Sequence, residues 1–141
     1  WRACSAAEPD RAMTDSVHAP AAQHRALVVD DLAAERERLA GILRGAGWEV
    51  ETAGSGVEAI EQVRRARPNI VFMDIVMPQM DGFEACRRLA CDPQTRTIPV
   101  VFVSTKNQRV DQVWARMQGG RELIGKPYTS SQVLDALRHA V

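Results

Sequence analysis

The chain has 141 residues, of which 45% are hydrophobic and 26% charged, a balance that favours one globular domain with an ordinary core. Lys plus Arg and Asp plus Glu each number 18, and this zero net charge argues against a nucleic-acid binder. No apolar run approaches the roughly 20 residues of a membrane span, so we expect no membrane insertion. The three cysteines form no Cys-x-x-Cys pair, which favours a reduced, cytoplasmic protein.

The first part of the chain differs from the rest in composition. Residues 1–24 are rich in Ala, Pro and polar side chains and show no periodicity, so we predict a flexible leader. The segment lacks the apolar centre of a secretory signal, and we infer no export. The sequence does not begin with Met, whereas Met13 opens a plausible start. Our hypothesis is that residues 1–12 are not native and that residues 25–141 form the folded domain.

From Arg25 onward, short apolar runs alternate with amphipathic stretches. The apolar runs predict strands at residues 26–29, 48–52, 70–73, 100–103 and 123–124. Several are continuous and β-branched, as expected for strands covered on both faces. The second run alternates, so we expect that strand near an edge of the sheet.

Apolar residues at helical spacing fill the gaps between the strands. They predict helices around residues 32–43, 57–63, 83–89, 110–117 and 133–141. Gly45 and Gly47 are expected to close the first helix, and Ser130 or Ser131 to cap the fifth. Five β-α units in succession imply an α/β fold, a doubly wound parallel sheet with helices on both faces. The expected strand order is 2-1-3-4-5, with a ligand site between the first and third strands.

Three acidic residues follow predicted strands at their carboxyl ends. Asp30 and Asp31 follow the first strand and Asp74 follows the third, and these strands are neighbours in the expected order. Three close carboxylates do not ionise comfortably without a cation, and a hard divalent ion such as Mg²⁺ would resolve the conflict. Asp74 could also act as a nucleophile and form an acyl phosphate. The plainer interpretation is that these residues only cap the first helix and a loop.

Two further polar residues end the remaining strands. Ser104 ends the fourth strand, and Lys126, before Pro127, ends the fifth. A hydroxyl and an ammonium there could hold the oxygens of a phosphoryl group on Asp74. Taken alone, a Ser or a Lys at such a position is more often an ordinary exposed polar residue. Only the convergence of four strand ends favours a site.

The segments LVVDD, FMDIVMPQMDGFEA, PVVFVSTKNQ and LIGKPY together resemble the receiver domains of two-component response regulators. The resemblance covers residues 25–141 and implies the flavodoxin-like fold in its CheY-like form, with five strands and five helices. It implies that Asp74 accepts a phosphoryl group from a histidine kinase. It also implies that Asp30, Asp31, Asp74 and the backbone carbonyl of Val76 hold Mg²⁺ or Mn²⁺, Asp30 largely through water.

The resemblance also implies roles for the residues that end the fourth and fifth strands. Ser104 stands at the family's switch position, and Lys126 is its characteristic lysine, joined to Pro127 by a cis peptide. Leu123 stands where the family often has an aromatic residue, so we expect altered coupling from Ser104 to the face that an unknown effector protein reads. That face comprises the fourth helix, fifth strand and fifth helix. Gly125 is expected to loosen the lysine strand.

Residues 92–120 look similar to single-domain receivers of the chemotaxis-like systems that control type IV pili and twitching motility, the PilH group. This predicts a stand-alone response regulator in a phosphorelay, with a CheA-like kinase as donor, no output domain and no conventional enzyme activity. Two alternatives are a phosphate sink for a shared kinase and an interaction module that needs no phosphorylation. A flavin- or nucleotide-binding enzyme would need a glycine-rich loop after the first strand, where Asp30-Asp31-Leu32 stands.

Two side chains outside this site have open interpretations. Trp114, on the apolar stripe of the fourth predicted helix, could be a partner contact or a core residue. Cys86 lies at helical spacing with Phe83 and Leu89, and we expect it in the core.

Overall fold

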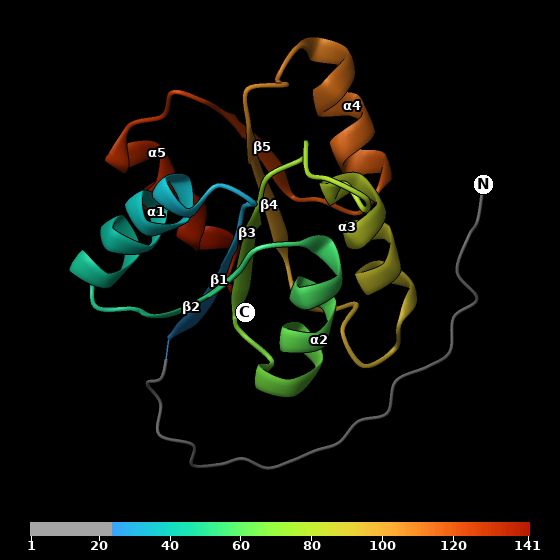
Figure 1. Cartoon of the computed structure of the whole chain (residues 1–141), viewed down its shortest axis with the longest axis horizontal. Coiled ribbons are helices and arrows are strands. Elements are labelled where there is room, and N and C mark those ends of the chain that lie inside the picture. The colour runs from blue at the N-terminus through green and yellow to red at the C-terminus, as the bar shows by residue number, and fades with distance from the viewer. Residues whose placement is uncertain (1–23) are drawn as a thin grey trace.

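The computed structural model describes residues 24–141 and contains one parallel five-stranded sheet (Figure 1). The strands are β1 (Arg25–Val29), β2 (Glu49–Ala53), β3 (Ile70–Met73), β4 (Val100–Ser104) and β5 (Glu122–Gly125). Their order is β2-β1-β3-β4-β5, which confirms the predicted doubly wound topology, with β2 at an edge. The predicted leader lies, except for His24, outside the described residues. Within residues 24–141, no helix is long and apolar enough to cross a membrane.

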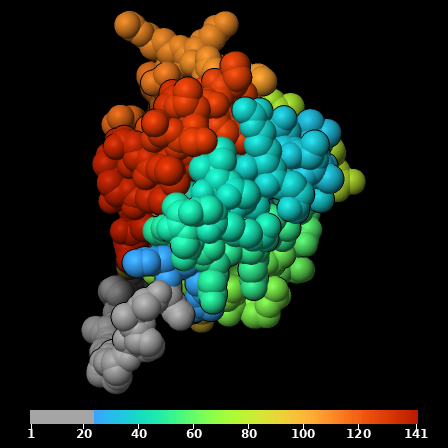
Figure 2. Space-filling model, turned by 90° about the vertical axis from the view of Figure 1, so that its left-hand side faces the viewer, coloured from blue at the N-terminus to red at the C-terminus, as the bar shows by residue number. Residues whose placement is uncertain are grey.

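Two layers of helices cover the sheet, one on each face (Figure 1). Helices α1 (Ala33–Gly45) and α5 (Ser130–Ala136) cover one face, and Figure 2 shows them side by side. Helices α2 (Gly56–Ala66), α3 (Gly82–Cys91) and α4 (Arg109–Met117) cover the other. Along β1, Ala26 and Val28 pack on the first side and Leu27 and Val29 on the second. This two-sided burial explains the continuous apolar runs.

The ends of the helices differ from the sequence-based expectation in several places. Thr129, not Ser130 or Ser131, caps α5, because its hydroxyl accepts from the Gln132 N–H while the Gln132 side chain returns to the Thr129 N–H. Thr followed three residues later by Gln is the sequence signature of this capping box. Helix α1 includes Gly45, and the turn instead uses Gly47, whose φ of 91° favours glycine.

Two apolar residues predicted on helix stripes lie outside their helices. Leu32 precedes α1 and is 57% exposed, and Val141 follows the short 3-10 helix η1 (Leu137–His139) and is 67% exposed. The α-helical part of the last segment ends at Ala136. Periodicity alone cannot mark such ends, because the apolar spacing continues past the last helical hydrogen bond.

Helix α4 exposes the apolar stripe that its sequence carries. The buried side of the helix carries Asp111 and Ala115 instead. Lys106 Nζ lies 2.9 Å from Asp111 Oδ1, and the Gln108 N–H donates to Asp111 Oδ2 at 2.9 Å. The pairing makes the burial of this carboxylate tolerable. The interpretation of Trp114 as a core residue is therefore wrong.

Cys86 is buried as predicted, in the layer between α3 and the sheet. Its Sγ donates to the Gln118 carbonyl oxygen at 3.3 Å. Burial raises the pKa of the Cys86 thiol to about 12, although Arg121 works against the rise. At pH 8 the native protein should therefore resist alkylation by iodoacetamide at Cys86, since roughly one thiol in ten thousand is ionised. Peptide mapping measures this, with urea-unfolded protein as the control; equal labelling of both would contradict the prediction.

Candidate functional site

Adjacent strands deliver the first two carboxylates to one edge of the sheet. Val29 of β1 pairs with Met73 of β3, so the residues that follow them, Asp30 and Asp74, lie side by side. The Asp74 N–H donates to the Val29 carbonyl at 3.0 Å. This is the switch point of the 2-1-3-4-5 order, where ligand sites of doubly wound sheets form.

The three predicted acidic residues come together there. One carboxylate oxygen from each of Asp30, Asp31 and Asp74 lies within 4.8 Å of the others. Asp30 and Asp74 are buried, and Asp31 is half-buried. None of them caps α1, because the residue at that position is Leu32, which has no side-chain cap hydrogen bond. Asp30 instead accepts from the Leu32 N–H at 3.0 Å, which holds the turn out of β1.

The carboxylate of Asp74 is oriented by its own loop. Its Oδ1 accepts from the Ile75 N–H at 2.7 Å and, at 3.3 Å, from the Val76 N–H. These two bonds leave Oδ2 pointing at Lys126 Nζ, 3.2 Å away. Asp74 thus presents one oxygen held by backbone and one oxygen toward the crevice.

Lys126 supplies the positive charge of the cluster. Its Nζ lies 2.9 Å from Asp30 Oδ2 and 3.7 Å from Glu35 Oε1, in addition to its bond with Asp74. Glu35, in the first turn of α1, is a neighbour that the sequence analysis missed, since nothing in strand-end logic points to it. The peptide bond between Lys126 and Pro127 is cis, as the resemblance implies.

The pKa values of the two central groups follow from this packing. Burial raises the pKa of Asp74, and the charge of Asp30 adds to the rise, while Lys126 and a hydrogen bond with Ser104 oppose it. For Lys126, burial acts to lower the pKa, but the hydrogen bond with Asp30 and the charges of Asp74 and Asp30 outweigh it and raise the pKa. The raised pKa of Asp74 means that the crevice favours the protonated, neutral form of this carboxyl. The raised pKa of Lys126 means that the lysine stays protonated.

The donor set fits a hard divalent cation. All three acidic residues offer carboxylate oxygens within one small cluster, and Mg²⁺ prefers oxygen ligands. Asp31 makes no hydrogen bond or ion pair through its carboxylate with any described residue, so that group is available. Burial and the neighbouring Asp30 carboxylate raise the pKa of Asp74. A second cation beside Lys126 would favour the ionised form of Asp74 and so oppose this rise in pKa.

Ser104, the last residue of β4, is fully buried beside this cluster. Its Oγ accepts from the Lys106 N–H at 3.1 Å, and the same hydroxyl acts to lower the pKa of Asp74. The structure thus places the predicted hydroxyl, amine and carboxylates in one crevice.

Two glycines matter to the site for reasons that the sequence did not reveal. At Gly82, a Cβ atom would lie 2.0 Å from the Asp74 carbonyl oxygen, so α3 begins directly against the acceptor loop. At Gly125, a Cβ atom would lie 2.2 Å from Asn107 Nδ2. Gly125 therefore makes room for the loop after Ser104. Leu123 packs at the rim of the core layer that includes α3.

A comparison with known families identifies the chain. The model of the response regulator receiver domain matches residues 26–138. This chain belongs to the response regulator receiver family. The receiver is 39% identical to Protein PilH of Pseudomonas aeruginosa over 113 residues, which cover 80% of this chain and 93% of PilH. It is 40% identical to Response regulator PleD of Caulobacter vibrioides over 103 residues, 73% of this chain but 23% of PleD.

Solved structures of receivers share the fold. Chemotaxis protein CheY4 of Vibrio cholerae superposes with a TM-score of 0.79 at 28% identity, covering 85% of this chain and all of that one. A putative response regulator from Chloroflexus aurantiacus gives a TM-score of 0.79 at 29% identity, covering 83% and 96% of the two chains. The fold is therefore CheY-like, as the resemblance implied. Receivers are signalling proteins and not conventional enzymes.

Proposed function

We propose that this receiver accepts a phosphoryl group on Asp74 from a histidine kinase and transmits the change to a protein partner. The observation that carries the proposal is the placement of Lys126 Nζ between Asp30 and Asp74, at 2.9 and 3.2 Å, beside buried Ser104. Such an arrangement can neutralise charge that develops on a phosphoryl group bound to Asp74.

The reaction uses Oδ2 of Asp74, the oxygen that faces the crevice and Lys126. Oδ2 attacks the phosphorus of a phosphohistidine in line, the new O–P bond forms as the P–N bond breaks, and the imidazole nitrogen keeps the electron pair. Lys126 then donates to phosphoryl oxygens in place of one of its carboxylate contacts. Asp30, Asp31, Asp74 and the Val76 carbonyl are the proposed ligands of Mg²⁺ or Mn²⁺, which would neutralise the transferred group further.

The signal follows from the added charge. A phosphoryl group brings about −1.5 to −2 charge into the crevice, which draws the Ser104 hydroxyl and the loop after β4 toward it. If this favours the active form by about 5.5 kcal/mol, the population moves from 1:99 to 99:1. An effector protein is proposed to read the change on α4, β5 and α5.

The similarity to PilH supports a more specific setting. Together with the resemblance of residues 92–120 to receivers of pilus-controlling systems, it favours a single-domain regulator in a chemotaxis-like phosphorelay. A CheA-like kinase is the proposed donor, in the cytoplasm, with a role in type IV pilus function or twitching motility. A phosphate sink for a shared kinase would use the same chemistry at Asp74.

Phosphotransfer tests the central proposal. The full chain is incubated with acetyl phosphate and MgCl₂ and read by intact mass; one phosphoryl group should be added, and none when EDTA is present. Asp74→Asn should remove the addition. Asp81→Asn is the matched control, since Asp81 caps α3 near the site and Asn caps equally well. Label that persists on Asp74→Asn would move the acceptor elsewhere, and an unlabelled wild type would favour an interaction module.

A further inference from the structure

The exposed face of α4 carries a continuous apolar stripe. Val110, Val113, Trp114 and Met117 are 56, 53, 48 and 55% exposed. Their spacing of i, i+3, i+4 and i+7 places them on one side of the helix. Scattered exposed apolar residues need no explanation, but a contiguous stripe with a half-exposed Trp is typical of a partner surface.

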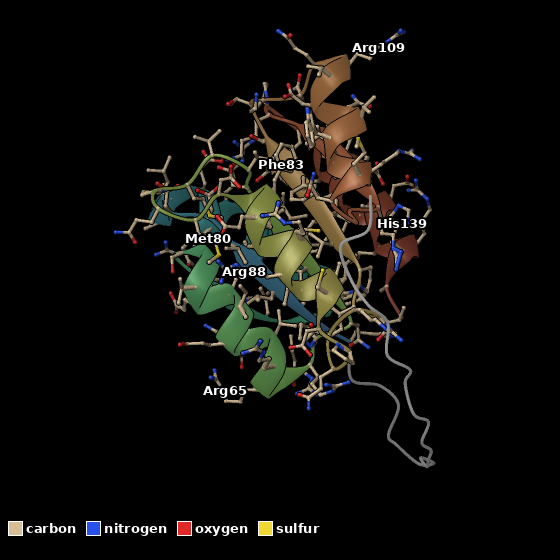
Figure 3. The ribbon with its side chains drawn as sticks, turned by 90° about the vertical axis from the view of Figure 1, so that its right-hand side faces the viewer. Arg65, Met80, Phe83, Arg88, Arg109 and His139 are labelled. Atoms are coloured by element: carbon tan, nitrogen blue, oxygen red, sulfur yellow. The ribbon has the colours of Figure 1, made fainter. Side chains whose placement is uncertain are left out.

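The stripe borders α3 through Trp114. Trp114 lines a shallow hollow of about 400 Å³ together with Phe83, Glu84 and Arg87 of α3. On the opposite side of α4, Gln112 lines a polar hollow along β5, and at 100° per residue it lies about 200° around the helix from Trp114. Figure 3 shows α3 and α4 next to each other, with Phe83 at the start of α3 close to α4. We call Val110, Val113, Trp114, Met117, Phe83 and Arg87 the α3–α4 surface.

Beside the α3–α4 surface lie internal ion pairs, the carboxylate of Asp81, which lines the same hollow and caps α3, and the guanidinium groups of Arg87 and Arg109 (Figure 3). Glu84 pairs with Arg88 at 2.8 Å, and Asp111 pairs with Lys106 at 2.9 Å. Arg87 donates only to the neutral Gln118 side chain, at 3.3 Å. Arg109, at the outer end of α4 in Figure 3, forms no ion pair among the residues described. Two guanidinium groups therefore border the apolar stripe without an anionic partner.

A chain of contacts joins this surface to the proposed switch. Ser104 Oγ accepts from the Lys106 N–H at 3.1 Å, and Lys106 Nζ binds Asp111 Oδ1 at 2.9 Å. Asp111 Oδ2 in turn accepts from the Gln108 N–H and so holds the first turn of α4. A displacement of Ser104 would therefore act through Lys106 and Asp111 on the start of the helix that bears the stripe.

We propose that the protein partner docks on the α3–α4 surface as an amphipathic helix whose apolar side is flanked by acidic residues. Apolar side chains of that helix would pack on Val113, Trp114 and Met117, and its carboxylates would pair with Arg87 and Arg109. The proposal rests on the proposed function for its regulation, in which Ser104 is the residue that responds to phosphorylated Asp74. It moves the principal contact from the β5 side of α4 to the α3 side.

The probe is a synthetic peptide of roughly four helical turns, with Leu at i, i+3, i+4 and i+7 and flanking Glu. It is titrated into the ¹⁵N-labelled full chain, and amide shifts are mapped by NMR. We expect saturable shifts on α3 and α4, and weaker binding of a peptide with Lys for Glu. Val113→Asp should weaken binding at least about tenfold, whereas the matched control Gln112→Asp, on the other side of α4, should leave it within about twofold.

Several results would overturn the proposal. These are no saturable binding of the Glu peptide, shifts confined to β5 and α5, or equal weakening by Val113→Asp and Gln112→Asp. Self-association of the wild type that Val113→Asp abolishes in sedimentation would make a second copy of the chain the occupant. Peptide binding that persists in Asp74→Asn supports the surface even where phosphoryl transfer is absent, so the two proposals can fail separately.

Discussion

Replacing Gly82 with alanine is expected to lower the free energy of unfolding by at least about 3 kcal/mol. The added Cβ atom would lie 2.0 Å from the Asp74 carbonyl oxygen and 2.9 Å from the Ile75 Cα atom. Both are backbone atoms, so no side-chain rotation relieves the clash. The Gly82 N–H donates to the Ile75 carbonyl at 2.7 Å, which ties α3 to the same segment. Urea denaturation measures the change.

Gly41→Ala is the matched control for this substitution. Gly41 is exposed inside α1, and a Cβ atom there would have no neighbour within 4 Å. The variant should gain about 0.5–1 kcal/mol, because alanine is the better helix former. Because α3 packs against the acceptor loop, Gly82→Ala should also slow phosphorylation from acetyl phosphate more than Gly41→Ala does. Similar small effects at both positions would show that the contact between α3 and Asp74 is looser than the structure has it.

The topology could be predicted because each strand carries a strong local signal. The runs at 70–73 and 100–103 are buried along their whole length, and such runs occur where helices cover both faces. The alternating second run identified β2 as an edge strand. The strand order followed from the number and sequence of the β-α units, together with the rules for doubly wound sheets.

Helix α4 shows where pattern analysis stops. Its apolar stripe has regular helical spacing, so the helix could be predicted. The direction of the stripe could not, because the side of α4 that packs on the sheet is small and carries Asp111 and Ala115. The burial of Asp111 depends on Lys106, which lies in the preceding loop. A loop conformation of this kind has no periodicity to detect.

The candidate site could also be predicted from the sequence only in part. Asp30, Asp31, Asp74, Ser104 and Lys126 could be placed together, because parallel strands end at one edge of the sheet. The contacts of Glu35 with Lys126 and of Asn107 with Gly125 could not, since they depend on how α1 and the loop after β4 approach the crevice. The close approach of Gly82 to the Asp74 carbonyl could not be predicted either, because it depends on how α3 packs against the acceptor loop.

The second large effect on stability is expected at Lys126. Lys126→Met should lower the free energy of unfolding by about 2–3 kcal/mol in buffer with EDTA, because two buried carboxylates, Asp30 and Asp74, lose their shared cation. The value is at the low end for a broken buried pair, since the Lys126 side chain is 13% exposed. Methionine keeps the length and the apolar stem of the side chain. Thermal or urea unfolding measures the loss.

A double-mutant cycle with Asp74→Asn isolates the electrostatic part of this loss. In the Asp74→Asn background, Lys126→Met should lower the free energy of unfolding by less than half as much. Only the Asp30 carboxylate then lacks its cation, and it has no charged Asp74 beside it to repel. Burial raises the pKa of Asp74 in the folded protein. A carboxyl with a raised folded-state pKa adds to the free energy of unfolding at pH values below its unfolded pKa. This contribution is lost as the pH rises through the folded-state pKa. The deficit of Lys126→Met should therefore shrink as the pH falls toward the acidic range.

Divalent cations should partly replace the missing lysine. Added MgCl₂ should stabilise Lys126→Met more than it stabilises the wild type, since the ion then balances all three carboxylates alone. NaCl at equal ionic strength controls for screening. An unchanged response to MgCl₂, combined with an equal cost of Lys126→Met in the wild-type and Asp74→Asn backgrounds, would mean that Lys126 contributes by packing and not by charge. The phosphoryl-binding role proposed for its ammonium would then lose its physical basis.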